Sequence, residues 1–154
     1  MALGATTYKT PNAINQIDSD FTGKEGCGVY LIDQGKVGIA TTSSTVPYGI
    51  VVVGGQSADG TYAGPIGGSA IEFVDQLGCV VQVTVSPNSA IYAGDFVVID
   101  NAEANGTFTS VANQGALISD WIWGLALTNA NPDEQCLMRF QPFAYFSTYT
   151  PPSP

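Results

Sequence analysis

The side chains of this chain that could do chemistry are three cysteines and a set of carboxylates, because the sequence contains no histidine. Histidine is the commonest general base and the commonest metal ligand, so its absence excludes Ser-His and Cys-His hydrolysis. Cys27, Cys79 and Cys136 are widely spaced and form no C-x-x-C motif, which excludes a zinc or redox motif. We expect them to be small buried residues within strands, with one pairing between two of them left open.

Two aspartates are the strongest candidates for an acid-base pair. Asp33 and Asp100 fall at equivalent positions of an internal repeat, and paired carboxylates are the machinery of glycosidases. An aspartate at a strand end, however, commonly caps backbone N–H groups of the following turn, and we favour that interpretation. Asp18-Ser19-Asp20 begins like a calcium loop, but the EF-hand glycine and distal glutamate do not follow. We therefore expect no catalytic residue, no hydrolase activity, no metal and no cofactor.

A pattern of short β-type runs occurs twice along the chain, and these runs must position the side chains above. Residues 26–33 (GCGVYLID) match residues 93–100 (AGDFVVID). Each copy is followed by a glycine-led run and then by an aromatic-glycine-aliphatic strand. These segments are residues 35–40 and 48–52 in the first half, and residues 106–111 and 123–127 in the second. A duplicated unit of this kind predicts two related β halves.

Composition favours a single all-β domain. The chain has 154 residues, enough to bury a core without metals or a disulfide lattice. Only 11% of its residues are charged, whereas 18 are glycine and the β-favouring Val, Ile, Thr, Tyr and Phe recur in short runs. We predict one small β-barrel or β-sandwich made of two pseudo-repeated halves.

The charge balance restricts the possible partners. The net charge is −9, from four Lys+Arg against thirteen Asp+Glu, which argues against nucleic acid because phosphate binding needs clustered cations. No apolar run approaches the roughly 20 residues needed to span a bilayer, so we expect no membrane partner. Residues 1–20 lack both the cationic leader and the apolar core of a secretory signal, and we expect synthesis in the cytosol.

The sequence predicts a division of the chain into three segments. Residues 1–20 form an extended N-terminal arm that contributes no core strand, and either it orders against a neighbour or it is a frayed terminus. Residues 21–141 form the β domain, and residues 142–154 form a C-terminal tail rich in proline and aromatic residues. Within the domain, residues 68–77 fit either a strand or one to two helical turns.

Period-2 patterning within the runs predicts which side chains are interior. The predicted interior residues are Val29, Leu31, Ile39, Ile50, Val52, Val81, Val83, Phe96, Val98, Phe108, Trp123, Leu125 and Leu137. Trp121 and Trp123 alternate along one strand, where a core tryptophan is commoner than a sugar-binding platform.

The order of motifs in the second half resembles that of the decoration, or cement, proteins of tailed-phage capsids. The segments that carry the resemblance are residues 93–100, the Gly-Thr-Phe run at 106–108, residues 123–127 (WGLAL) and residues 136–140 (CLMRF). With both halves counted, the resemblance extends over residues 26–140, and it is close only in the second half. The insertion at residues 56–77 and the aromatic tail depart from the family pattern.

The resemblance implies a β-tulip-like fold and a structural protein, not an enzyme, on the outer surface of a virion capsid. It implies two partners, the major capsid protein and further copies of the chain, and a homotrimer because such proteins commonly sit near three-fold positions. We expect the contacts in the arm and the tail, at Tyr8, Ile14, Ile17, Phe143, Tyr145, Phe146 and Tyr149. Two alternatives are a carbohydrate- or surface-binding module, such as a head fibre or adhesin, and a small hydrolase that uses carboxylates alone.

Overall fold

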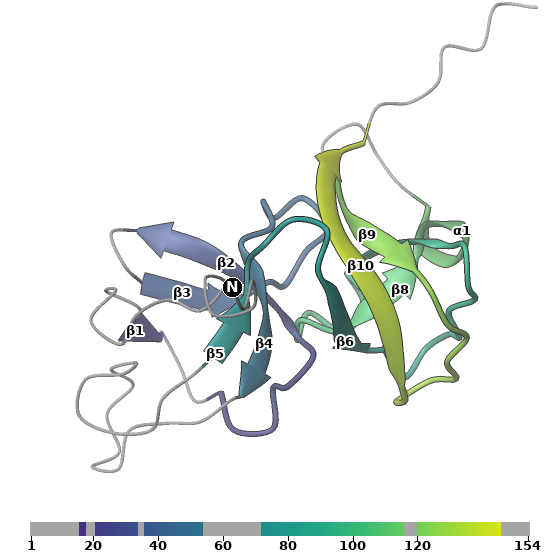
Figure 1. The fold of residues 1–154 in the computed structure, drawn as a ribbon, viewed down its shortest axis with the longest axis horizontal. Coiled ribbons are helices and arrows are strands. Elements are labelled where there is room, and N and C mark those ends of the chain that lie inside the picture. Colours follow the sequence, from purple (N-terminus) through teal and green to yellow (C-terminus); the bar gives the residue numbers. More distant parts are fainter. Residues whose placement is uncertain (1–15, 18–20, 34–35, 54–71, 116–119, 146–154) are drawn as a thin grey trace, which may run out of the picture.

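Two five-stranded sheets form the protein in a computed structural model, which describes residues 16–17, 21–33, 36–53, 72–115 and 120–145. The first sheet comes from the first half of the chain and has the strand order β1-β3-β2-β4-β5 (Figure 1). Its strands are β1 (Gln16–Ile17), β2 (Gly28–Asp33), β3 (Lys36–Ile39), β4 (Gly49–Val53) and β5 (Glu72–Val74). β1 pairs with β3 in parallel, and the other pairs are antiparallel.

The second sheet comes from the second half and has the strand order β6-β10-β9-β7-β8. Its strands are β6 (Val80–Thr84), β7 (Phe96–Ile99), β8 (Phe108–Ser110), β9 (Trp121–Ala126) and β10 (Gln135–Ala144), and all of them pair antiparallel. A four-residue helix, α1 (Val111–Gln114), follows β8, and the Ser110 hydroxyl caps it by accepting from the Asn113 N–H at 3.2 Å. The predicted all-β class is confirmed, in an open two-sheet form whose described strand orders do not close into a barrel.

The internal repeat is present in the strand pairing. The order β3-β2-β4-β5 in the first sheet corresponds to β8-β7-β9-β10 in the second. Val29 lies opposite Gly49 in the first sheet, and Val97 lies opposite Gly124 in the second. The two halves therefore share topology and register, with Val29 equivalent to Val97.

The repeat is shifted by one residue from the alignment that the sequence suggests. Matching residues 26–33 to 93–100 makes Val29 equivalent to Phe96. In the structure, however, Gly28 lies opposite Ile50 and Phe96 lies opposite Leu125, so Gly28 is the counterpart of Phe96. Successive residues of a strand point to opposite faces, so a slip of one residue exchanges the buried and exposed sides. The structural register aligns the exposed Phe96 with the buried Gly28 of the first half.

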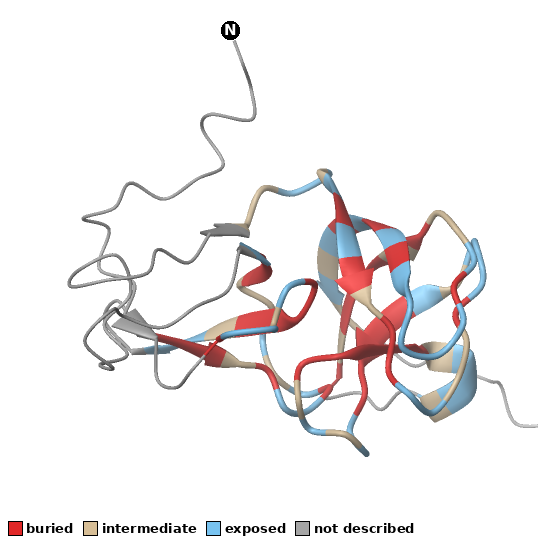
Figure 2. Cartoon of the chain, turned by 90° about the horizontal axis from the view of Figure 1, so that it is seen from below, coloured by how far each residue is buried: buried red, intermediate tan, exposed pale blue. Residues whose placement is uncertain are grey.

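The larger core cluster joins the two halves. Ala40 and Ile50 of the first half belong to the same buried cluster as the rings of Phe108, Trp123 and Phe140 in the second. Trp123 is central, because its ring centroid lies 5.4 Å from that of Phe108 and 6.4 Å from that of Phe140. Figure 2 shows the buried segments concentrated around and between the strands of the second sheet. A smaller cluster lies within the first sheet, formed by Phe21, Val29, Val37 and Val51.

Seven of the predicted interior residues are buried: Val29, Ile50, Val81, Val83, Val98, Phe108 and Trp123. Ile39 and Leu125 are half-buried. Four assignments are wrong, because the structure exposes Leu31, Val52, Phe96 and Leu137. In β10 the reason is register, since every second residue from Cys136 onward faces the core and Leu137 therefore points outward.

The sequence indicates two further segments only in outline. Within the predicted extended arm, residues 16–17 form the short edge strand β1, which pairs with β3. Within residues 68–77, Glu72–Val74 form β5, so the strand alternative holds there.

Hydrogen bonds across the halves fix their arrangement. The Gly28 N–H donates to the Gly106 carbonyl at 2.9 Å, and the Thr84 N–H donates to the Gly26 carbonyl at 3.0 Å. At a third point, the buried Ser43 hydroxyl donates to a carboxylate oxygen of Asp120 at 2.8 Å. Backbone and side-chain bonds of this kind, together with the shared core, hold the two sheets as one unit.

Candidate docking surface

The three cysteine thiols have positions typical of structural residues. Cys27 and Cys136 are buried, Cys79 is half-buried, and all three are free, so the pairing left open by the sequence is not made in this structure. Burial raises the pKa of the Cys27 thiol to about 11, which keeps it protonated and unreactive at neutral pH. The described residues contain no group of three or more His, Cys, Asp or Glu side chains that could hold a metal ion.

Asp100 is tied into the turn that follows β7. One carboxylate oxygen accepts from the Ala102 N–H at 2.8 Å, and the other accepts from the Asn88 amide at 2.9 Å. Burial raises the pKa of Asp100, but the hydrogen bonds from Ser86, Asn88 and the backbone outweigh it and hold the pKa below its ordinary value. These contacts fit the turn-capping interpretation; the side chain of Asp33 lies outside the described part of the structure.

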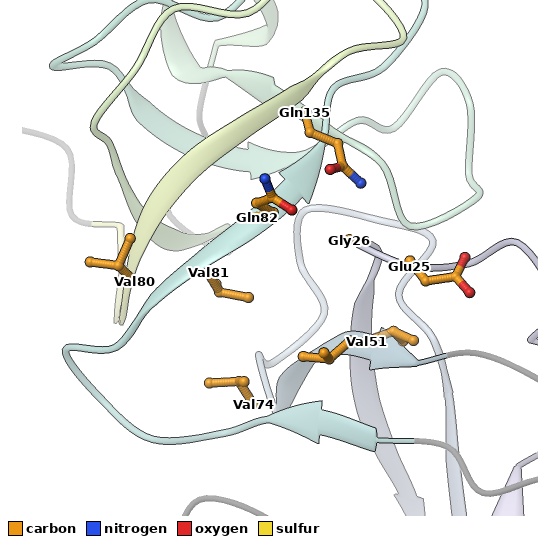
Figure 3. A pocket seen from close by; sticks show the side chains of 9 residues that line it. Glu25, Gly26, Val51, Val74, Val80, Val81, Gln82 and Gln135 are labelled. Carbon is orange, nitrogen blue, oxygen red and sulfur yellow. The ribbon is translucent and has the colours of Figure 1, made fainter. Parts of the chain in front are cut away.

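Two hollows of the described surface each contain a single carboxylate. A groove of about 280 Å³ separates β4 and β5 from β6, and Figure 3 shows Val51, Val74 and Val81 around it. Glu25 is its one lining carboxylate. A second hollow, of about 290 Å³ beside α1, is lined by amides and hydroxyls, with Asp100 as its one carboxylate. Carboxylate-only hydrolysis needs two such groups facing one cleft, and neither hollow offers that pair.

The tryptophans do not form a sugar-binding platform. Trp123 is fully buried in the core, and Trp121 is half-buried. Stacking on a sugar requires a ring face open to solvent, so the observation that would favour a carbohydrate-binding module is missing at this pair of residues.

An apolar strip crosses the solvent face of the second sheet. Phe96, Leu125, Arg139 and Val80 are directly opposite one another on β7, β9, β10 and β6, so they share one face. Leu137, two residues before Arg139, lies on that face as well. Four apolar members of the strip have substantial exposed fractions: Val80 52%, Phe96 50%, Phe143 42% and Leu137 37%. We call these residues, with Leu125 and Arg139, the outer strip.

The end of the described chain joins the outer strip. Phe143 packs edge-on against Phe96 with ring centroids 5.6 Å apart, which extends the strip toward the C-terminus. Just beyond it, the Tyr145 N–H donates to the Asp120 carbonyl at 2.9 Å. The chain therefore leaves the second sheet at a fixed point beside exposed aromatic rings.

The repeat shows what covers the equivalent strip in the first half. The row Gly28, Ile50 and Val74 corresponds to Phe96, Leu125 and Arg139. Gly28 lies so close to the second half that a Cβ atom there would come within 2.8 Å of the Trp123 ring, and Ile50 belongs to the shared core. Gly28 and Ile50 of the first row are thus buried by a neighbouring module and Val74 is half-buried beside it, whereas the counterpart row in the second sheet faces solvent.

The predicted contact residues are only partly within the described chain. Tyr8, Ile14, Phe146 and Tyr149 lie outside the described residues, and Ile17 is placed by its backbone pairing with Val37 in β1 and β3. Phe143 and Tyr145 lie at the end of the second sheet, where Phe143 is part of the outer strip. Sequence patterning misses Phe96 and Leu137 because it assigns both to the interior. The register of the repeat would not have corrected this for Phe96, since its counterpart Gly28 is buried.

Comparison with known proteins gives a likeness of fold. No protein-family model matches this chain, and no curated protein matches it. A chain of the solved structure "The capsid of Myoviridae Phage XM1" is similar to it with a TM-score of 0.51 and 21% sequence identity, over 92% of this chain and 88% of that chain. The similarity extends over nearly the whole of both chains, so the two-sheet architecture described above is one that a chain of a phage capsid structure also has. Among the described residues, no helix is long and apolar enough to cross a membrane.

Proposed function

We propose that this protein is a non-enzymatic virion component that decorates and stabilises the outer surface of a tailed-phage capsid. The observation that carries the proposal is the outer strip, a row of mostly apolar side chains with Arg139 among them on the solvent face of the second sheet. The likeness in fold to a chain of a phage capsid structure supports it, as does the order of motifs in the second half. The partner is the major capsid protein.

The outer strip suits a protein partner for two reasons. Contiguous apolar side chains rimmed by polar groups are typical of protein-protein contact surfaces. The equivalent row of the first half is already covered by a module of the same fold, which supports docking through this face of the sheet. Arg139 places one cation within the strip of a chain whose net charge is −9, and it favours an acidic group on the partner.

Firm attachment of so small a domain requires several contacts acting together. The arm residues Tyr8, Ile14 and Ile17 and the tail residues Tyr145, Phe146 and Tyr149 would add contacts around the strip, with Phe143 belonging to both. A homotrimer would link three such surfaces, and linked sites bind far more tightly than one. Sedimentation of the purified protein is expected to give a trimer.

Co-sedimentation with capsids that lack this protein tests the proposal. Phe96→Ser combined with Val80→Ser removes two apolar side chains from the outer strip and is expected to weaken binding at least tenfold, because central apolar contacts dominate such interfaces. Tyr92→Ser is the matched control, since Tyr92 is exposed but is not part of the strip, and it should bind as the wild type does. Equal binding by all three proteins would contradict the role of the strip, and absence of binding by the wild type would contradict the function.

A further inference from the structure

A third hollow, of about 460 Å³, lies on the first half of the molecule and is lined by aromatic and apolar side chains. Tyr30 and Leu31 of β2 form one wall, and Val46, Pro47 and Tyr48 of the loop before β4 form the other. Two hydroxyl residues of the same loop complete the lining, which contains no charged side chain. We call this hollow the tyrosine groove.

The tyrosine groove is held in shape by the surrounding structure. The Tyr48 N–H donates to the Val29 carbonyl at 3.0 Å, and Tyr48 packs against the core cluster of the first sheet. The Thr45 N–H donates to the Thr42 carbonyl at 3.1 Å, which closes the turn that carries Val46. A preformed groove loses little conformational entropy when it is filled.

The chemistry of the groove fits a proline-rich strand. Uncharged grooves lined by aromatic rings bind polyproline II segments, whose extended shape exists before binding and is stiffened by proline. Residues 146–154 of this chain have the sequence FSTYTPPSP, with three prolines, two aromatic residues and no charged side chain. Groove and segment therefore match in chemistry.

The tail begins next to the groove. The Tyr145 N–H is bonded to the carbonyl of Asp120, and the Asp120 carboxylate accepts from Ser43 at 2.8 Å. The Trp121 N–H donates to the Ser43 carbonyl at 2.8 Å, which makes a second link to the same residue. Ser43 directly precedes Ser44, the first residue of this loop that lines the groove. Nine further residues can span about 30 Å when extended, which is ample for a groove that starts beside the point of departure.

We propose that the tyrosine groove is a docking site for the chain's own proline-rich tail, residues 146–154, bound in the same molecule. A short tether gives the tail an effective concentration in the millimolar range, so even a site of modest intrinsic affinity is mostly filled. Docking holds Phe146 and Tyr149 against the body of the free protein and leaves the outer strip open. The proposal stands whether or not the protein binds capsids.

Limited digestion of the full-length protein with chymotrypsin tests the docking. Cleavage after Tyr149 is followed by intact mass, and a docked tail is cleaved slowly because the protease needs an open segment. Val46→Asp places a charge on an exposed residue of the groove and should raise the cleavage rate about tenfold if roughly 90% of tails are docked. Leu77→Asp is the matched control, because it places the same charge on an exposed apolar residue that does not line the groove. Equal rates in all three proteins would overturn the proposal.

Nuclear Overhauser effects identify the occupant directly. The methyl groups of Leu31 and Val46 should show contacts to the ring protons of Pro151 and Pro152 in the free full-length protein, and replacing both prolines with alanine should remove them. A sample mixed from labelled and unlabelled chains separates contacts within a molecule from contacts between molecules. Contacts that appear only between molecules would make the tail of a second copy the occupant and would overturn the proposal. A groove that is empty in the free protein and covered only on capsids would overturn it as well.

Discussion

At the scale of single residues, two glycines are required because backbone or rings lie where a side chain would be. Gly28 faces the Trp123 ring and Ile99 at the junction of the halves. Gly124 lies against the carbonyl oxygen of Arg139 on the neighbouring strand, so a Cβ atom there would overlap with backbone. Since backbone cannot rotate away as the end of a side chain can, Gly124 is the more restrictive of the two.

Gly124→Ala is therefore expected to destabilise the protein by about 3 kcal/mol or more, through overpacking between β9 and β10. Gly23→Ala is the control, because no atom lies within 4 Å of the position that its Cβ atom would take and only the φ of +73° opposes the change. That strain costs about 1 kcal/mol. Urea unfolding measures both, and a loss at Gly124 no larger than at Gly23 would contradict the close approach.

The hydrogen bonds of Asp100 lead us to expect that the protein loses stability in acid. Its pKa is held below the ordinary value in the folded state, so its contribution is fully present above the unfolded pKa and is lost as the pH falls through the folded pKa. Asp100→Asn should remove this component, and its free energy of unfolding should fall less than that of the wild type between about pH 7 and about pH 3. Identical slopes for Asp100→Asn and the wild type would contradict the assignment.

At the scale of elements, the loop before β4 links the two sheets through Ser43. The buried hydroxyl lies between the Asp120 carboxylate at 2.8 Å and the Asn101 amide at 3.0 Å, and the Ser43 N–H donates to the Asn101 side chain at 2.7 Å. Three bonds from one residue of the first half thus reach two loops of the second.

Ser43→Ala is expected to cost about 1–3 kcal/mol, because it leaves the buried Asp120 carboxylate short of one partner and also removes the bond to the exposed Asn101 amide. The neighbouring Ser44→Ala removes a hydroxyl at an exposed position and should change stability by less than about 0.5 kcal/mol. Differential scanning calorimetry at neutral pH distinguishes the two variants. A Ser43 variant as stable as the Ser44 variant would show that the loop is not a structural link.

At the scale of the whole molecule, the arm can be tested apart from the fold. β1 is only two residues long and lies at the edge of the first sheet, so the segment before it can be removed without touching a described strand. Deleting residues 1–15 should leave the circular dichroism spectrum β-dominated and the melting temperature nearly unchanged, while capsid occupancy falls several-fold through loss of linked contacts. Undiminished capsid occupancy would contradict the role of the arm and would leave the outer strip and the tail as the attachment sites.

The sequence by itself determined the class of the fold and the existence of the repeat. Short alternating runs separated by glycine-rich turns have few solutions other than antiparallel sheets, because each run must bury one face. The equivalence of Gly49 and Gly124, each following an aromatic residue, was likewise visible in the sequence and is confirmed by the pairing. The absence of histidine excluded whole classes of mechanism before any geometry was known.

Tertiary structure alone decided which face of each run is buried and where a surface remains open. The first copy of the repeat buries the row at Gly28 because the second half packs on it, while the equivalent row at Phe96 has no third module to cover it among the described residues. A pattern with period 2 cannot distinguish these cases, since a slip of one residue exchanges the faces and local composition tolerates either choice. The outer strip depends on the register of four paired strands, and the tyrosine groove depends on how β2 packs beside the loop before β4. Neither arrangement is encoded by a local pattern.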